Sequence, residues 1–193
     1  MTGQIGQLTA RIETAIAAVD PTPPPDGDHP GRLPLLDRLD EIPGVGRTAA
    51  AVIIAEIGVD MSVFPTPGLA SWAKLVPRTI QSGARATHGP TGSGNGWLKD
   101  PLGEAAMTAA KTKTFLGARY RRIARHAPAK KAMVAVARKI LEIAWVLIYD
   151  PDARFTDLGP DRHDRHVDRT RKTRQAVREL EHLGYTVTLT EAA

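Results

Sequence analysis

The sequence predicts an all-α protein: a compact helical domain containing a helix-hairpin-helix, preceded by a helical arm and followed by a short helix and tail. Of its 193 residues 42% are hydrophobic but only 5% aromatic, so Ala, Val, Ile and Leu must build the core, which favours close-packed helices. Several segments repeat apolar residues at helical spacing and end at Gly or Pro. Cysteine is absent from the sequence, which excludes disulfides, thiolate zinc sites and cysteine nucleophiles.

Residues 1–20 predict an amphipathic helix with a coiled-coil seam. Its apolar residues follow heptad spacing: Ile5, Leu8, Ile12, Ala15 and Val19. Two heptads do not hold together alone, so we expect the stump of a longer coiled coil. Residues 21–31 contain five prolines and predict a semi-rigid linker.

The main domain is expected over residues 32–150. Helices are expected at 33–39, 47–57, 69–75, 97–110, 114–125 and 129–149, with a glycine-rich loop over 77–96. The last helix is nearly all apolar from Ile140 to Ile148, which indicates the central buried helix. Residues 151–193 predict a charged connector, a helix over 171–183 that ends at Gly184, and a β-like tail over 185–189.

The charge is unevenly distributed along the chain. The net charge is +5 and the pI is about 9.7. Residues 1–60 carry a net charge of −5, whereas residues 111–150 carry +8. The basic block between residues 111 and 139 contains no acidic residue: Lys111, Lys113, Arg119, Arg121, Arg122, Arg125, Lys130, Lys131, Arg138 and Lys139. It predicts a polyanionic partner, with a cationic surface that has no partner as the alternative.

A second candidate for nucleic-acid contact is the sequence around Ile42-Pro-Gly-Val-Gly46. The glycines permit a tight turn, and the following helix adds its positive N-terminal end. We therefore expect the turn to hold one backbone phosphate through Gly44, Val45, Gly46 and Arg47. An ordinary helix-to-helix turn that uses Pro and Gly is the alternative.

The glycine-rich loop contains one candidate nucleophile, Ser82. Arg78, Arg85 and Lys99 are close to it in sequence and could clamp a phosphate, although no general base accompanies them. A Ser-Gly pair in a loop is otherwise an ordinary turn. Trp97 follows the loop and is the best of the three tryptophans for stacking on a base or sugar.

Two other site classes are not expected. His163 and His166 have a helical metal-ligand spacing, but the interleaved arginines disfavour a cation, and we expect no metal site in this chain. The apolar run Ile143–Tyr149 is too short to span a membrane, and residues 1–6 do not resemble a signal peptide. We expect a cytoplasmic protein with no membrane partner.

Residues 35–150 resemble a known family. The ordered set IPGVG, FPTPGLASWAKLVP, QSG and GNGWLK looks like the carboxy-terminal transposase domain of the DEDD-type, bridge-RNA-guided insertion-sequence transposases. The resemblance implies that Ser82 is the nucleophile that attacks a DNA phosphate. From their position near Ser82 or in the basic block, the cations that we expect to contact nucleic acid are Arg78, Arg85, Lys99, Lys111, Lys113, Arg121, Arg122 and Arg125.

The resemblance also implies partners. DNA, a guide RNA and further copies of the chain are expected, and Mg²⁺ would be held by an amino-terminal carboxylate domain that this sequence does not contain. We therefore expect an amino-terminally truncated transposase with no cofactor of its own and little strand exchange in isolation. A non-catalytic helix-hairpin-helix module that binds nucleic acid is the alternative, and an inert remnant is a third reading.

Overall fold

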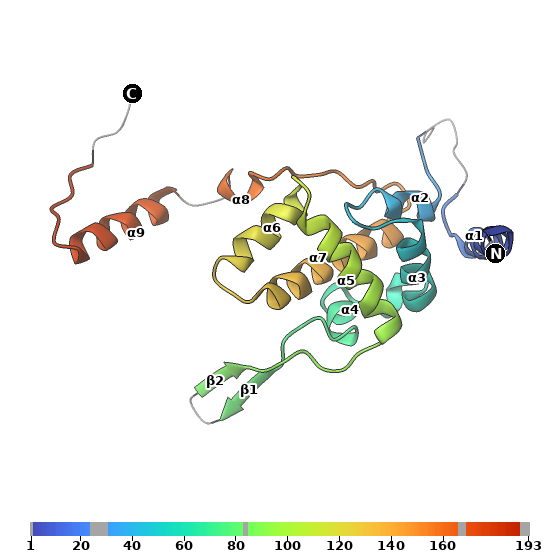
Figure 1. Ribbon diagram of the computed structural model, residues 1–193, viewed down its shortest axis with the longest axis horizontal. Coiled ribbons are helices and arrows are strands. Elements are labelled where there is room, and N and C mark those ends of the chain that lie inside the picture. The colour runs from blue at the N-terminus through green and yellow to red at the C-terminus, as the bar shows by residue number, and fades with distance from the viewer. Residues whose placement is uncertain (1, 24–30, 83–84, 166–168, 190–193) are drawn as a thin grey trace. The chain divides into compact units, whose positions relative to one another are not determined.

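The computed structural model describes residues 2–23, 31–82, 85–165 and 169–189. The chain divides after Pro160 into two units, a larger one over residues 1–160 and a smaller one over 161–193. Most of the described residues are helical, and the strands are confined to one short pair (Figure 1). The predicted all-α fold class is confirmed.

The larger unit contains most of the helices. In chain order its elements are α1 (Thr2–Val19), α2 (Leu35–Asp40), α3 (Arg47–Ile57), the 3₁₀ helix η1 (Met61–Val63), α4 (Thr66–Trp72), β1 (Thr79–Ser82), β2 (Arg85–His88), α5 (Gly96–Ala110), α6 (Phe115–Ala124) and α7 (Ala129–Tyr149). The expected helix over 69–75 begins and ends three residues earlier, as α4. Lys74 follows it with a positive φ of 54°, which ends the helical path.

Helix α7 is the centre of the core, as the apolar run predicted. It packs against α2, α4, α5 and α6. Its buried residues repeat at helical spacing: Ala132, Val136, Ala137, Ile140, Leu141, Ala144, Leu147 and Ile148. Alanines on α5 and α7 let the two backbones approach closely, which is how a chain poor in aromatic residues fills its interior.

Two glycines are required by the packing around α5. A Cβ on Gly117 of α6 would lie 2.1 Å from the carbonyl oxygen of Thr112. A Cβ on Gly44 would lie 2.2 Å from the carbonyl oxygen of Ala105, and Gly44 also has a φ of +90°. Both distances are far inside van der Waals contact, so a side chain at either position would displace α5 or the turn that ends it.

Arg38 of α2 is the largest fully buried side chain, with 1% of its surface exposed. Its guanidinium donates hydrogen bonds to the carbonyl oxygens of Leu33, Leu147 and Asp150, and to the hydroxyl oxygen of Thr22. Burial lowers the pKa of Arg38, while the charges of nearby aspartates act in the opposite direction. One side chain thereby joins α2 to the C-terminal end of α7, where helix carbonyls lack partners.

Helix α1 and the segment after it are joined to this core. Ile16 of α1 is buried, and α1 packs against α3. The carboxylate of Asp20 accepts hydrogen bonds from the backbone N–H groups of Thr22 and Leu35, so it caps the start of α2. Most of the predicted linker, residues 24–30, lies outside the described residues.

The expected loop over 77–96 contains a pair of antiparallel strands, so that prediction is wrong for residues 79–82 and 85–88. β1 and β2 pair antiparallel with Thr79 opposite His88 and Ser82 opposite Arg85. Figure 1 shows the two strands extending beyond the helices of this unit. Two residues, one of them Gly, separate the strands in sequence, which is a known hairpin spacing that the glycine-rich composition obscured.

The smaller unit contains α8 (Arg162–Arg165) and α9 (Arg169–His182). The predicted end of the last helix is confirmed, because Gly184 has a φ of +89° and Tyr185 N–H donates to the carbonyl oxygen of Leu180. The predicted β-like tail is wrong, because residues 185–189 form no strand. His163 is in α8, whereas His166 lies outside the described residues.

Candidate nucleic-acid interface

The most basic surface of the larger unit is formed by the turns and helices from the end of α5 to the start of α7. Six of the ten basic residues of the block are exposed: Lys111, Lys113, Arg121, Arg125, Lys130 and Lys131. Basic residues in the last turn of α6 suit the negative end of that helix, but Lys130 and Lys131 are in the first turn of α7, where cations are unfavourable. Because this placement costs electrostatic free energy, it favours binding of an external anion by Lys130 and Lys131 over a role of these lysines within the fold.

At least one cation of this surface already has hydrogen-bond partners within the protein. Arg121 donates from its guanidinium to the carbonyl oxygens of Thr112, at 3.0 Å, and Ala110, at 3.4 Å. It therefore caps the C-terminal end of α5. Lys111 and Lys113 are in the same turn and are exposed, so they extend the positive surface that Arg121 helps to shape.

The predicted phosphate-binding turn lies between α2 and α3, but two of its four residues have packing roles. Gly44 lies against the backbone of α5. Val45 is 4% exposed, and its N–H donates to the carbonyl oxygen of Ile42 at 2.9 Å, so this donor is already used. Gly46 is exposed, with open space where a Cβ would be, and precedes α3 without a capping side chain. The donors that this turn can still offer are those of the first turn of α3.

Arg47 begins α3 and is held by two acidic residues. Its guanidinium pairs with Glu13 of α1 and with Asp37 of α2. The hydrogen bonds from these two carboxylates raise the pKa of Arg47. The turn thus lies in the acidic part of the chain, and a phosphate there would have to replace carboxylates that already neutralise Arg47.

Ser82 ends β1, and the ladder sets Arg85 of β2 opposite it. The side chains of both residues lie outside the described side chains. Ser82 is four residues beyond Arg78 along an extended strand, a separation of about 13 Å at 3.3 Å per residue. The ladder therefore places Arg85, and not Arg78, as the basic residue nearest to Ser82 along the hairpin.

Arg78 and Lys99 both lie against Gly92, in the loop that follows the hairpin. Lys99 Nζ donates to the carbonyl oxygen of Gly92 at 2.9 Å, and a Cβ on Gly92 would lie 2.8 Å from a terminal nitrogen of Arg78. Gly89 N–H also donates to the carbonyl oxygen of Arg78 at 2.7 Å. These contacts hold the loop after the hairpin against the segment before it, and they bring two of the predicted cations together.

Trp97 in the first turn of α5 is 80% exposed. The carboxamide of Asn95 caps this helix by accepting from Trp97 N–H at 3.0 Å, and its amide nitrogen donates to Glu56 of α3. The backbone at Trp97 is thereby fixed while its indole remains in solvent. An exposed indole beside a rigid helix start can stack on a base or sugar.

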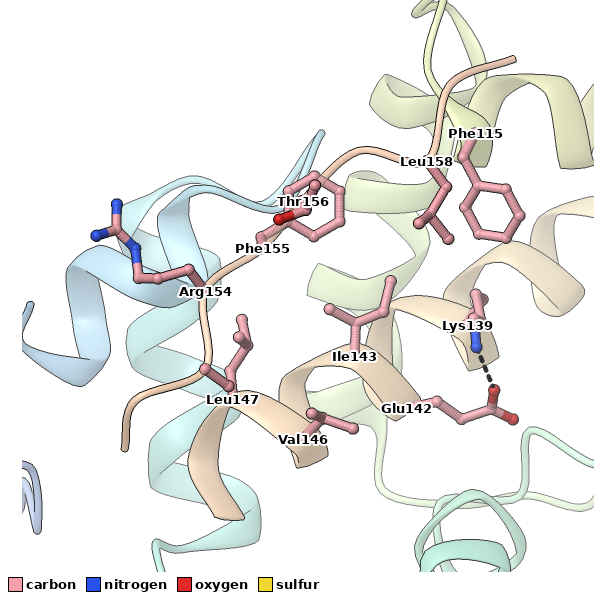
Figure 2. A pocket seen from close by; sticks show the side chains of 11 residues that line it. Phe115, Lys139, Glu142, Ile143, Val146, Leu147, Arg154, Phe155, Thr156 and Leu158 are labelled. Carbon is pink, nitrogen blue, oxygen red and sulfur yellow. Dashed lines mark hydrogen bonds and ion pairs between the residues drawn. The ribbon is translucent and has the colours of Figure 1, made fainter. Parts of the chain in front are cut away.

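A separate apolar groove of about 270 Å³ runs between α7 and the returning segment 153–158. Figure 2 shows Phe115 and Leu158 at one end and the Lys139–Glu142 ion pair beside them. Its remaining lining is mostly aliphatic or aromatic, including Ile143 and Phe155. No grouping typical of acid–base or nucleophilic chemistry occurs among its lining residues.

The described ranges give little support for a metal site or a membrane-spanning helix. There, no three His, Asp or Glu side chains gather closely enough to hold a metal ion. The described residues do not fit the Mg²⁺ that the resemblance implies, which that resemblance assigns to a separate carboxylate domain. Among the described helices, none has both the length and the apolar composition needed to cross a membrane.

Comparisons with known proteins associate the larger unit with one class of mobile-element proteins. Residues 36–121 match the model of the transposase IS116/IS110/IS902 family. The chain is also 33% identical over 121 residues to the insertion element IS110 uncharacterized 43.6 kDa protein of Streptomyces coelicolor. That alignment covers 61% of this chain and 29% of the relative, so the chain spans less than a third of the relative's length. Both comparisons support an IS110-type transposase.

Proposed function

We propose that this chain is the DNA-binding part of an IS110-type transposase and that it supplies Ser82 as the nucleophile for DNA strand exchange. The observation that carries the proposal is the family match over residues 36–121, which includes the α2–α3 turn, the β-hairpin with Ser82, all of α5 and most of α6. The basic surface from Lys111 to Lys131 agrees with a DNA partner.

The proposed reaction exchanges one phosphodiester for another. Ser82 Oγ attacks a backbone phosphorus atom, so an O–P bond to the serine forms and the bond from phosphorus to one sugar oxygen breaks. The hydroxyl proton of Ser82 leaves to solvent or a base, and the released sugar oxygen takes up a proton. A sugar hydroxyl of another strand then reverses the step and frees the serine, so no oxidant or nucleoside triphosphate is needed.

We assign DNA binding to two regions of the larger unit. The exposed cations between α5 and α7 attract the backbone without regard to sequence. Arg85, opposite Ser82, is the residue best placed to pair with the attacked phosphate, because it lies in the same hairpin. Arg78 and Lys99 hold the base of that hairpin, so we assign them a positioning role.

The first experiment measures DNA binding by fluorescence anisotropy with a labelled duplex of 30 base pairs. If the basic surface binds the backbone, the dissociation constant rises steeply with salt, and Lys130→Gln/Lys131→Gln reduces the salt slope by about two. Arg11→Gln/Arg174→Gln removes the same charge from exposed positions on α1 and α9 and should leave the slope unchanged. Binding that ignores salt would contradict the proposal.

The second experiment tests Ser82. The chain is mixed with a separately expressed carboxylate domain, Mg²⁺, guide RNA and end-labelled DNA, and covalent protein–DNA adducts are separated on a denaturing gel. An adduct with the wild-type chain and with Ser93→Ala, but not with Ser82→Ala, supports the assignment. An adduct that survives Ser82→Ala removes this residue from the reaction. DNA binding without any adduct favours the non-catalytic module.

Self-association through α1 is a further part of the proposal. Its predicted seam is uncovered, since the exposed fractions of Ile5, Leu8, Ile12 and Val19 are 66%, 58%, 44% and 54%. A seam of this kind is normally buried against another helix. Sedimentation should show a concentration-dependent oligomer that Leu8→Glu dissociates. A monomer at all concentrations would exclude association through this helix.

A further inference from the structure

Arg119 of α6 is a half-buried cation, and one of its guanidinium nitrogens is buried without being used in a hydrogen bond among the described residues. Its Nε atom is shielded from solvent and has no hydrogen-bond partner in the part of the chain that the structure describes. Buried polar atoms in folded proteins are nearly always paired, because an unpaired donor loses its hydrogen bonds to water and gains none within the protein. Arg119 was not among the residues predicted to bind nucleic acid.

The groups around Arg119 leave it with excess positive charge. Burial has the largest effect and lowers the pKa of Arg119. The nearby charges of Arg122 on α6 and Arg138 on α7 act in the same direction, and Glu142 on α7 opposes them. Glu142 already accepts from Arg138 at 2.8 Å and from Lys139 at 3.3 Å. The carboxylate that acts on Arg119 is therefore already shared with two other cations.

Repulsion of this kind is unusual inside a helix pair. α6 and α7 pack against each other, and a like charge at this contact costs free energy that an apolar side chain of the same length would not. Guanidinium groups suit a phosphate in particular, because its oxygens accept paired N–H donors.

We propose that Arg119, Arg122 and Arg138 form a binding site for a backbone phosphate of nucleic acid at the junction of α6 and α7. This inference rests on the proposed DNA-binding function and names a contact for it. A polymer is favoured over a single ion, because exposed Arg121 and Arg125 continue the positive charge along α6. Glu142 limits the net charge of the empty site by holding Arg138 and Lys139.

The first test uses inorganic phosphate and thermal unfolding, and it does not depend on DNA. An anion that binds the folded state raises the melting temperature, so wild-type protein should melt at least about 2 °C higher in 50 mM phosphate than in chloride of equal ionic strength. Arg119→Met keeps the length and apolar contacts of the stem and removes the charge. It should melt as high as wild type or higher in chloride and lose the response to phosphate.

The second test uses a labelled DNA duplex and anisotropy at several salt concentrations. Arg119→Met and Arg122→Met should each weaken binding at least about fivefold and reduce the salt slope by about one. Arg11→Met, an exposed arginine on α1, is the matched control with the same change in net charge and should bind as wild type does. Arg122 is half-buried, so its variant serves if Arg119→Met fails to fold.

The outcomes of these tests distinguish the α6–α7 site from the proposed DNA-binding function. Wild-type binding with no difference between these variants and Arg11→Met would overturn the α6–α7 site and leave the proposed DNA-binding function standing. Failure of the wild-type chain to bind any duplex would overturn the function itself. A phosphate response that Arg119→Met abolishes, without loss of DNA affinity, would make the cluster a site for free anions and overturn its assignment to the nucleic-acid backbone.

Discussion

The guanidinium of Arg38 donates a hydrogen bond to the backbone carbonyl oxygen of Leu147, which lies 109 residues later in the chain. This contact joins the first helix of the central domain to the last. The same side chain also reaches the carbonyl oxygen of Asp150 at 2.9 Å and the hydroxyl of Thr22 at 2.8 Å. The C-terminal end of α7 is thus capped by an arginine from another helix rather than by its own sequence.

Replacing Arg38 should therefore destabilise the whole larger unit. Arg38→Met keeps the stem but leaves the carbonyl oxygens of Leu147 and Asp150 buried without this donor. We expect a loss of about 3 kcal/mol in the free energy of unfolding, measured by urea denaturation. Arg11→Met removes an exposed arginine from α1 and should cost less than about 1 kcal/mol. Equal losses in both variants would contradict a capping role.

The two glycines of the α2–α3 turn should respond differently to the same substitution. Gly44→Ala would set a Cβ 2.2 Å from the carbonyl oxygen of Ala105 and would force an alanine to a φ of +90°. We expect a loss of more than about 2 kcal/mol in the free energy of unfolding. Gly46→Ala meets open space at an ordinary φ of −99° and should change stability by less than about 1 kcal/mol.

Variants of Gly44 and Gly46 also distinguish a packing role of the α2–α3 turn from a phosphate-binding role. If the turn holds a phosphate, a bulkier Gly46 variant that unfolds like wild type will still bind duplex DNA less tightly. If its only role is to turn the chain, the Gly46 variant will bind as wild type does, and any loss in the Gly44 variant will follow its loss of stability. Gly46→Val, compared by anisotropy and by urea midpoint, provides this test.

The ion pair between Glu41 and Arg154 predicts a pH dependence of stability. Arg154 donates to both carboxylate oxygens of Glu41, which lowers the pKa of that carboxyl below its usual 4.5. A carboxyl with a lower pKa in the folded state adds stability above pH 4.5, and this contribution disappears as the pH falls through the folded-state pKa. Both side chains are partly exposed, so the contribution is at most about 1 kcal/mol.

Urea midpoints at pH 7, 5 and 3 would measure this contribution. Glu41→Gln should be less stable than wild type at pH 7, and the difference should shrink as the pH falls and the wild-type carboxyl takes up a proton. Asp40→Asn makes the same change in net charge at an exposed neighbour and serves as the control. A difference for Glu41→Gln that stays constant over this pH range would show that the pair acts only through shape.

The helical core could be predicted because its signals are local. The apolar run from Ile140 to Ile148 marked α7, and Gly58 and Gly184 marked the ends of their helices. The β-hairpin was missed, because strands of four residues in a glycine-rich, polar segment carry almost no periodicity. Its existence depends on pairing across the turn rather than on the propensity of either strand.

The candidate site was harder to predict for a related reason. Sequence reasoning identified the basic block, but it could not tell exposed cations from those with internal partners. Arg47 is paired with Glu13 and Asp37, and Arg121 caps α5, although both were predicted to bind nucleic acid. Conversely, Arg119 is half-buried, and its Nε atom has no hydrogen-bond partner among the described residues. These differences arise from contacts between distant segments, which the spacing of residues along the sequence does not reveal.

Trp97 offers a final prediction, because its indole is 80% exposed while its backbone is fixed by Asn95. Trp97→Ala removes little packing, so the free energy of unfolding should change by less than about 0.5 kcal/mol. If the indole stacks on a base, single-stranded DNA should bind about 1–3 kcal/mol less tightly, and Trp97→Phe should restore part of the loss. Trp72→Ala is the contrasting variant, because its ring packs 5.2 Å from that of Phe64 and its loss should reduce stability. Unchanged affinity in Trp97→Ala would exclude stacking at this position.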